Sequence, residues 1–255
     1  MLLAVDIGNT NILFGLFDEN SLVFKARISS DRKITAEQYA LAIKGVVDLK
    51  NADFENVSGA IISSVVPELT SLVRDAIMML TGVEAVVLGP GVKSGLPIKI
   101  DNPAQLGADL VAGAVGAIDK YSAPCLVIDL GTATKISVID VTGAYRGCVI
   151  SAGVGISLNA LSGAASLLPV IDINSENCPV YGTNTVSSMQ SGIIQGTAAM
   201  LDGMCEKIEK ALGENNITVV ATGGYADAIL PCCQRKIIYE PDLILRGLKK
   251  IYEKN

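Results

Sequence analysis

Residues 2–10 read LLAVDIGNT, and residues 125–134 read CLVIDLGTAT. Each stretch opens with an apolar run, which predicts a buried strand, and ends in a turn that contains glycine. Asp6-Ile7-Gly8 aligns with Asp129-Leu130-Gly131 at an offset of 123 residues, and an apolar second strand is expected after each turn. A repeat of this length indicates the duplication of a whole domain, not a short solenoid repeat.

An Asp-x-Gly sequence at the end of a strand is suited to phosphate chemistry. Glycine allows backbone conformations in which the turn amides approach a phosphate, and the carboxylate can face a hydrated divalent cation. Asn9 and Thr10 add short polar side chains to the first turn. One such turn is often an ordinary turn. Two copies, each between a first and a second strand, resemble the ATPases of the actin, Hsp70 and sugar-kinase type.

The composition limits the classes of protein to consider. The chain has 255 residues, of which 50% are hydrophobic and 18% are charged, so a packed α/β protein is expected. The net charge of -6 gives no electrostatic footprint for nucleic acid or an anionic membrane. No apolar run reaches the roughly 18 residues of a membrane span, and no basic leader precedes Asp6. A cytoplasmic location is therefore expected.

The chain contains no histidine, which excludes Ser-His-Asp, Cys-His and histidine-metal mechanisms. A general base must then be Asp, Glu, Lys, Tyr or Cys. The six cysteines show no C-x-x-C spacing, and reduced thiols are expected. The adjacent pair Cys232 and Cys233 leaves redox chemistry as an alternative.

Two further segments have more than one interpretation. The apolar strand at 219–222 runs into Gly223-Gly224, which predicts either a surface for an adenosine or a tight strand-to-helix turn. Asp109 opens an apolar helix expected over 107–120. Its carboxylate is either an N-terminal capping charge or the general base of a kinase.

The remaining expectations concern organisation. The C-terminal lysines 249, 250 and 254 are expected on a solvated helix face. The hydrophobic pattern predicts helices near 35–48, 68–80 and 107–120. It predicts strands at 2–6, 11–17, 21–28, 59–67, 125–129, 136–141, 144–150 and 219–222.

Several motifs together resemble type III pantothenate kinase over essentially the whole chain. They are Asp6-Ile-Gly-Asn-Thr10, Ser63-Ser-Val-Val-Pro67, Asn102-Pro103, Gly107-Ala-Asp109, Asp129-Leu-Gly-Thr-Ala-Thr134, Asn184-Thr185, Ser191-Gly192, Thr222-Gly-Gly224 and the tail from Asp242. The resemblance implies an α/β fold of two duplicated ribonuclease H-like domains, 1–117 and 118–255, with an ATP cleft between them.

The same resemblance implies an activity and its partners. The expected reaction is ATP-dependent phosphorylation of pantothenate to 4'-phosphopantothenate, the first step of coenzyme A biosynthesis. Mg²⁺ and a monovalent cation, K⁺ or NH₄⁺, are the implied cofactors. The implied assembly is a homodimer with the active site at the interface.

Site residues follow from the resemblance by position. Asp109 would be the catalytic base, Asp6 would bind Mg²⁺ and Asp129 would bind the monovalent cation. The residues implied to hold ATP are Asp6, Ile7, Gly8, Asn9, Thr10, Asn11, Thr132, Gly223 and Gly224. Those implied to border pantothenate are Gly107, Ala108, Asp109, Leu110 and Thr185, with Thr185 donated across the dimer.

The chain departs from the family pattern at several positions. Leu110 replaces an arginine that would face the anionic substrate, and Lys135 replaces a threonine after the second turn. A tyrosine usual near Ile100 is missing, and Ala152 replaces a proline. These changes leave two alternatives to an active pantothenate kinase. One is an impaired nucleotide-binding paralogue that serves as a regulatory or partner subunit, and the other is a kinase for a different small alcohol.

Overall fold

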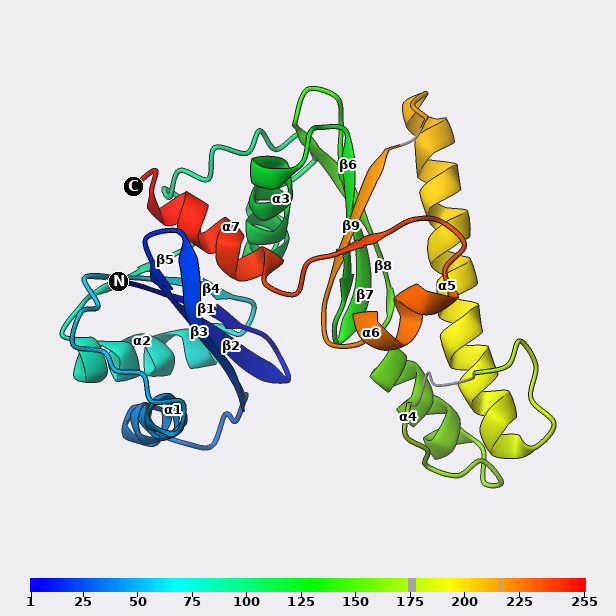
Figure 1. The fold of residues 1–255 in the computed structure, drawn as a ribbon, viewed down its shortest axis with the longest axis horizontal. Helices are drawn as coiled ribbons and strands as arrows, with labels where there is room; N and C mark the ends of the chain where they lie inside the picture. Colours follow the sequence, from blue (N-terminus) through cyan, green and yellow to red (C-terminus); the bar gives the residue numbers. More distant parts are fainter. Residues whose placement is uncertain (174–177, 216) are drawn as a thin grey trace. The chain divides into compact units, whose positions relative to one another are not determined.

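The computed structural model describes residues 1–173, 178–215 and 217–255 (Figure 1). The chain divides into two compact units. The first contains Met1–Leu96, Asp101–Lys120 and Asp242–Asn255, and the second contains Pro97–Ile100 and Tyr121–Pro241. Residues 242–255, which the sequence placed with the C-terminal half, thus belong to the first unit, and the units are not simply the two sides of residue 117.

The first unit is built on a mixed five-stranded sheet in the order β3-β2-β1-β4-β5. Strands β1, β2 and β3 form an antiparallel meander, whereas β4 and β5 run parallel to β1. Their bounds are β1 Leu2–Ile7, β2 Asn11–Asp18, β3 Ser21–Ser29, β4 Gly59–Ser64 and β5 Ala85–Val87. All three strands of the meander lie where the sequence predicts them.

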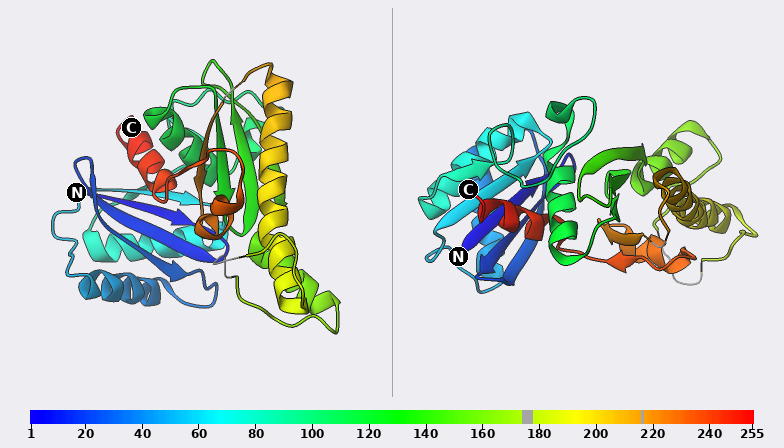
Figure 2. Two further views of the ribbon diagram at one scale, coloured as in Figure 1. Left: turned by 45° about the vertical axis from the view of Figure 1, so that its right-hand side comes forward. Right: turned by 90° about the horizontal axis from the view of Figure 1, so that it is seen from above.

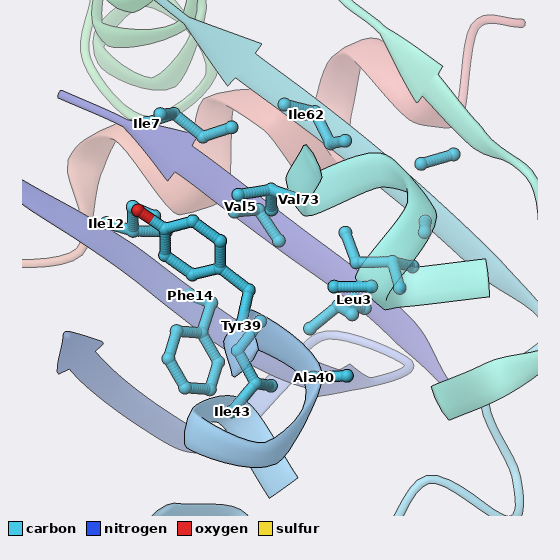
Figure 3. Close-up of a cluster of buried hydrophobic side chains, with 14 of the residues drawn as sticks. Leu3, Val5, Ile7, Ile12, Phe14, Tyr39, Ala40, Ile43, Ile62 and Val73 are labelled. Carbon is cyan, nitrogen blue, oxygen red and sulfur yellow. The ribbon is translucent and has the colours of Figure 1, made fainter. Parts of the chain in front are cut away.

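One face of this sheet carries the main core of the first unit. Helices α1 (Ala36–Leu49) and α2 (Pro67–Thr81) cover that face, and Figure 3 shows Tyr39 and Ile43 of α1 packed among side chains of β1 and β2. Thr35 and Gln38 form a capping box at the start of α1, as the sequence predicts. Because side chains alternate along a strand, Asp6 and Ser63 lie on the opposite face from this core.

Helices α3 (Ala108–Lys120) and α7 (Leu243–Tyr252) pack together and contact strands β1 and β4 of the first unit. Their backbones meet at two glycines. A Cβ on Gly247 would lie 1.8 Å from the carbonyl oxygen of Ala112, and one on Gly116 would lie 2.4 Å from that of Leu243. This close approach explains why the C-terminal helix joins the first unit, since only glycine leaves room for it.

The expectation of a solvated lysine face is wrong for Lys249. Lys249 is only 7% exposed, and its ammonium group donates to Asn20 Oδ1 at 2.9 Å and to Glu253. The hydrogen bond from Lys249 lowers the pKa of the Glu253 carboxyl below its ordinary value. Lys250 pairs with Asp119 at 3.5 Å. The Lys250 pair arises because α7 packs on α3, and the Asn20 contact joins α7 to the turn between β2 and β3. Neither contact is encoded in the local sequence of α7.

The second unit repeats the topology of the first. Its sheet has the order β10-β9-β6-β7-β8, with an antiparallel meander β6-β7-β8 and with β9 and β10 parallel to β6. The bounds are β6 Cys125–Leu130, β7 Ala133–Ile139, β8 Tyr145–Ala152, β9 Thr218–Thr222 and β10 Ile238–Tyr239. The predicted duplication is therefore confirmed at the level of strand order and direction.

Helices cover one face of the second sheet. They are α4 (Val154–Ala164), α5 (Thr185–Leu212) and the short α6 (Ala226–Ile229), and Figures 1 and 2 show α5 lying along the sheet. Helices α4 and α5 were not among the elements that the sequence predicts. The second strand of this unit was predicted to begin at residue 136, whereas β7 starts at Ala133 because Thr134 pairs with both Leu130 and Ser151.

Within the part of the chain that the structure describes, no helix is long and apolar enough to cross a membrane.

Candidate active site

The first Asp-x-Gly turn closes the end of β1. The Gly8 amide donates to the Asn11 carbonyl at 2.9 Å. Ser30, directly after β3, stabilises the turn with two hydrogen bonds. Its hydroxyl donates to the Gly8 carbonyl at 2.6 Å, and its amide donates to the Thr10 carbonyl at 3.0 Å. Asn9, Thr10 and Asn11 are exposed. The turn is thus a fixed backbone loop that presents polar side chains.

Ile7 differs from the exposed polar residues of the turn in its burial. Its side chain is fully buried in the core of the first unit. Its carbonyl accepts the Val65 amide at 3.0 Å. A contribution of Ile7 to phosphate binding would therefore come from its backbone amide alone.

Ser63 is a candidate site residue to which the sequence assigned no role. It is the direct parallel neighbour of Asp6 across β1 and β4, and it is fully buried. Among the described residues, its hydroxyl is one of three buried side-chain polar atoms without a hydrogen-bond partner. A buried hydroxyl is normally paired, so this atom points to a water or a ligand beside Asp6. The quoted Ser63-Ser64 stretch was the available signal.

Arg32 adds a cation to the same turn. Its guanidinium lies 3.4 Å from Asn9 Oδ1. Arginine is well suited to phosphate oxygens because its donors form a planar fork. Arg32 could not be predicted from local sequence, because it follows β3, more than 20 positions after the turn, and only the meander brings it back.

Asp109 lies in the first turn of α3 and is partly buried. Its Oδ1 accepts the Leu110 amide at 2.9 Å, so the expected interaction with the helix start exists. A Cβ on Gly107 would lie 2.5 Å from that oxygen and 3.7 Å from Val65 Cγ1. Val65 in turn donates to Ile7. The start of α3 thus lies at the end of the sheet where β1 and β4 finish, on the side that Asp6 and Ser63 face.

Ala108 and Leu110 flank Asp109 at the start of α3, and both are partly exposed. Leu110 brings an uncharged aliphatic side chain to the start of α3. The Leu110 amide already donates to the Gly107 carbonyl and to Asp109 Oδ1. The region around Asp109 therefore gains no cation from this residue.

The second Asp-x-Gly turn closes the end of β6. It is packed tightly by two glycines from elsewhere in the second unit. A Cβ on Gly153 would lie 2.2 Å from the Thr132 carbonyl oxygen, and one on Gly223, whose φ is +104°, would lie 2.5 Å from the Leu130 backbone. Thr132 itself is exposed. The turn is held by backbone contacts and presents its threonine outward.

Gly224 is exposed beside the same turn, and the next residue, Tyr225, donates its amide to the Leu130 carbonyl at 3.2 Å. The strand-to-helix turn that the sequence predicts is confirmed, since α6 begins at Ala226.

Thr185 is the first residue of α5 and is also exposed. It follows the N-cap Asn184, whose side chain accepts a hydrogen bond from the Ser187 amide at 2.9 Å.

Asp129 and Lys135 form an ion pair beside the second turn. The distance from Lys135 Nζ to Asp129 Oδ2 is 2.9 Å, and the two side chains are 16% and 18% exposed. On its other side, Asp129 is the register partner of Thr222, which is buried. Each first-strand aspartate thus has a hydroxyl residue as its parallel neighbour, Ser63 in one unit and Thr222 in the other.

The two turns differ in how well their oxygen ligands suit a bound cation. Asp6 and the Ser63 hydroxyl offer oxygen ligands, which Mg²⁺ prefers. Within the described residues, no three Cys, Asp or Glu side chains gather into a metal site, so Mg²⁺ would depend on phosphate and water for its other ligands. Asp129 does not fit a monovalent cation in the same way, because the Lys135 ammonium already occupies its carboxylate.

Three of the buried or partly buried cysteines have thiols that are weaker acids than usual. Burial raises the pKa of the Cys233 thiol to about 12 and those of Cys125 and Cys205 to about 11. A thiol with a pKa in this range is protonated at neutral pH and is a poor nucleophile. These three residues therefore do not supply the general base.

Solved structures share the fold. A glucokinase of the ROK family from Streptomyces griseus, solved with glucose and AMPPNP, gives a TM-score of 0.54 at 15% identity, covering 100% of this chain and 99% of that one. The activator of 2-hydroxyisocaproyl-CoA dehydratase from Clostridium difficile, solved with ADPNP, gives 0.55 at 15% identity, covering 98% and 93%. These likenesses show the fold, which is that of two ribonuclease H-like domains.

Sequence comparisons narrow this class to a family. The family model for type III pantothenate kinase matches residues 2–207. A type III pantothenate kinase from Shouchella clausii is 41% identical over 100% of both chains, and one from an Exiguobacterium species is 40% identical over 100% of this chain and 99% of that one. This chain belongs to the type III pantothenate kinase family.

Proposed function

We propose that this protein transfers the γ-phosphoryl group of ATP to the primary hydroxyl of pantothenate, the first step of coenzyme A biosynthesis. The observation that carries the proposal is the placement of Asp109 in the first unit. Its carboxylate opens α3 at the end of the sheet where the Asp6 turn and Ser63 lie. Membership in the family supports the choice of pantothenate.

Asp109 is the base in this mechanism. The pantothenate hydroxyl gives its proton to the Asp109 carboxylate while its oxygen forms a bond to the γ-phosphorus. The bond between that phosphorus and the bridging oxygen of ADP breaks, and ADP leaves with the electron pair. The bond from the Leu110 amide to Oδ1 keeps the carboxylate oriented for this transfer. Phosphoryl transfer needs little beyond such positioning and charge stabilisation, which suits a chain without histidine.

The rest of the site binds and orients ATP. Asp6 and Ser63 would hold Mg²⁺ or its water, and Mg²⁺ would neutralise charge on the phosphates when bound. The amides of the first turn and the Arg32 guanidinium would contact phosphate oxygens. In the second unit, Thr132 would contact ATP, and the exposed Gly224 beside it would lie against the adenosine.

We also propose that the protein acts in the cytoplasm as a homodimer. Large apolar side chains are exposed along α4 and the residues that lead into α5, and a patch of this kind is typical of a protein interface. They include Ile156, Leu161, Leu167, Val170, Val180, Tyr181 and Val186. Thr185 lies in this sequence, which supports its donation to the site of a partner subunit.

The test compares the wild-type protein with Asp109→Asn in an assay of ADP release that contains pantothenate and Mg²⁺. Loss of the base should lower kcat by about 10²- to 10⁴-fold. The affinity for a non-hydrolysable ATP analogue should stay within about twofold, because Asp109 acts on the acceptor. Asp119→Asn, at the other end of α3, is the matched control and should keep full turnover.

Two results would contradict this assignment. Equal turnover of wild type and Asp109→Asn would remove Asp109 from the reaction. Absence of pantothenate turnover in the wild-type protein, with intact binding of the ATP analogue, would favour the nucleotide-binding paralogue instead. A panel of small alcohols would then identify a kinase with another acceptor.

A further inference from the structure

We propose that the ammonium group of Lys135 takes the place of a monovalent cation beside Asp129, so that this protein binds ATP without potassium or ammonium ions. The inference rests on the proposed function only in taking the second turn as an ATP-binding element. It concerns a residue of this chain that departs from the family pattern and that forms a defined contact in the structure.

Strand register places the two charged groups together. Asp129 is the second residue from the end of the pairing between β6 and β7, and Lys135 is its direct antiparallel partner. Directly opposed residues project on the same face of a sheet. Asp129 and Lys135 therefore lie opposite the core residues Leu130 and Ile136, and they make their contact without any change of backbone.

The contact is partly shielded from water. With side-chain exposures of 16% and 18%, the pair is screened less than a surface pair. A lysine ammonium is a compact point charge with three donors, and it carries the same charge as a potassium ion. Held at 2.9 Å from Oδ2, it supplies Asp129 with the neutralising charge that a bound cation would supply.

The two cations would also exclude each other. A monovalent cation bound to the Asp129 carboxylate would lie within a few ångströms of the Lys135 ammonium, and like charges at such a distance repel. One carboxylate neutralises only one of them. The tethered ammonium has the advantage, since the strand holds it at the site and no free ion has to be bound from solution.

The pair lies directly against the phosphate turn. A Cβ on Gly131 would lie 3.2 Å from Asp129 Oδ1, so the carboxylate packs on the turn that ends at Thr132. The charge of Asp129 is then close to bound phosphate, and leaving it without a cation would oppose ATP binding. Lys135 is thus a positioning residue that acts through Asp129.

The experiment measures the affinity for a non-hydrolysable ATP analogue with Mg²⁺ by calorimetry. Titrations are made in tetramethylammonium chloride and in potassium chloride at the same ionic strength. The wild-type Kd should agree within about twofold between the two salts. Lys135→Thr should bind about tenfold more weakly in tetramethylammonium chloride, the effect of losing one charge-assisted contact, and potassium should restore its affinity. Lys207→Thr, at an exposed site on α5, should behave as wild type.

A direct measurement of cation binding complements the calorimetry. Thallium(I) replaces potassium in many sites and can be followed by its NMR signal. Lys135→Thr should bind thallium, and the wild-type protein should not. The inference is overturned if potassium strengthens wild-type ATP-analogue binding about tenfold, or if thallium binds the wild type in a way that Asp129→Asn abolishes. Neither measurement uses pantothenate, so failure of the proposed reaction would be recognised separately.

Discussion

Asp6 and Ser63 are direct neighbours at the ends of two parallel strands, and the buried Ser63 hydroxyl has no hydrogen-bond partner in the part of the chain that the structure describes. The next residue, Ser64, differs sharply. Its hydroxyl bonds to the Val66 amide at 3.1 Å, to the Val66 carbonyl at 3.2 Å and to the Thr70 hydroxyl at 2.8 Å. The two adjacent serines therefore differ in their bonding: Ser64 is tied into the fold, and Ser63 is a candidate ligand-binding residue.

Ser63→Ala should lower activity at limiting Mg²⁺ on the order of tenfold, because it removes an oxygen beside Asp6. It should leave stability unchanged or raise it by up to about 1 kcal/mol, since an unpaired buried hydroxyl is lost. Ser64→Ala, the control, should lower stability by about 1–2 kcal/mol with the Mg²⁺ dependence unchanged. Denaturant unfolding and Mg²⁺ titrations measure both effects. A loss of stability in Ser63→Ala without any change toward Mg²⁺ would show that the hydroxyl is structural.

Leu110→Arg should tighten the binding of pantothenate. The guanidinium would stand at the start of α3 beside Asp109, where it can pair with the carboxylate of the substrate. One charged hydrogen bond of about 1.5–3 kcal/mol corresponds to a roughly ten- to hundredfold lower KM. Leu110→Met keeps an apolar side chain and should leave KM unchanged. Steady-state kinetics with varied pantothenate tests this, and an unchanged KM in Leu110→Arg would place the substrate carboxylate elsewhere.

Gly153→Ala should weaken ATP binding by about tenfold or more, because its Cβ would displace the carbonyls of Gly131 and Thr132. The turn would move as a unit, so the KM for pantothenate should change less than the KM for ATP. Gly163→Ala in α4 meets nothing within 4 Å and is the matched control. Calorimetry with an ATP analogue gives the measurement. Normal affinity in Gly153→Ala would mean that the second turn tolerates the shift or does not contact ATP.

Gly247→Ala should destabilise the first unit by about 1–3 kcal/mol or more, since α7 would be pushed away from α3 at Ala112. Gly45→Ala in α1 has open space around its position and should instead stabilise by about 0.5–1 kcal/mol, the ordinary gain of alanine over glycine in a helix. Thermal unfolding compares the two. If both variants gained stability, α7 would not be packed on α3 in solution.

Much of the fold around the candidate site could be predicted from local sequence. The two turns at Asp6 and Asp129, the strands before and after them, and the capping box of α1 depend on short-range patterns and were predicted. The helices α4 and α5 were missed. In α4 the start has no side-chain cap. The start of α5 did carry a signal, since Asn184 caps it and Gly213 marks its end. The described residues between these helices, 165–173 and 178–184, contain no helix or strand.

The sequence by itself determined the duplicated strand–turn–strand pattern and the family, because both are written in contiguous residues. Tertiary structure decided which distant residues share each site. Ser63 joins Asp6 through parallel strand pairing, and Arg32 returns to the first turn through the meander. Lys135 meets Asp129 through strand register, and α7 joins α3 through two glycines. Hydrogen-bond register and close packing act between segments far apart in the chain, so a local pattern cannot specify them.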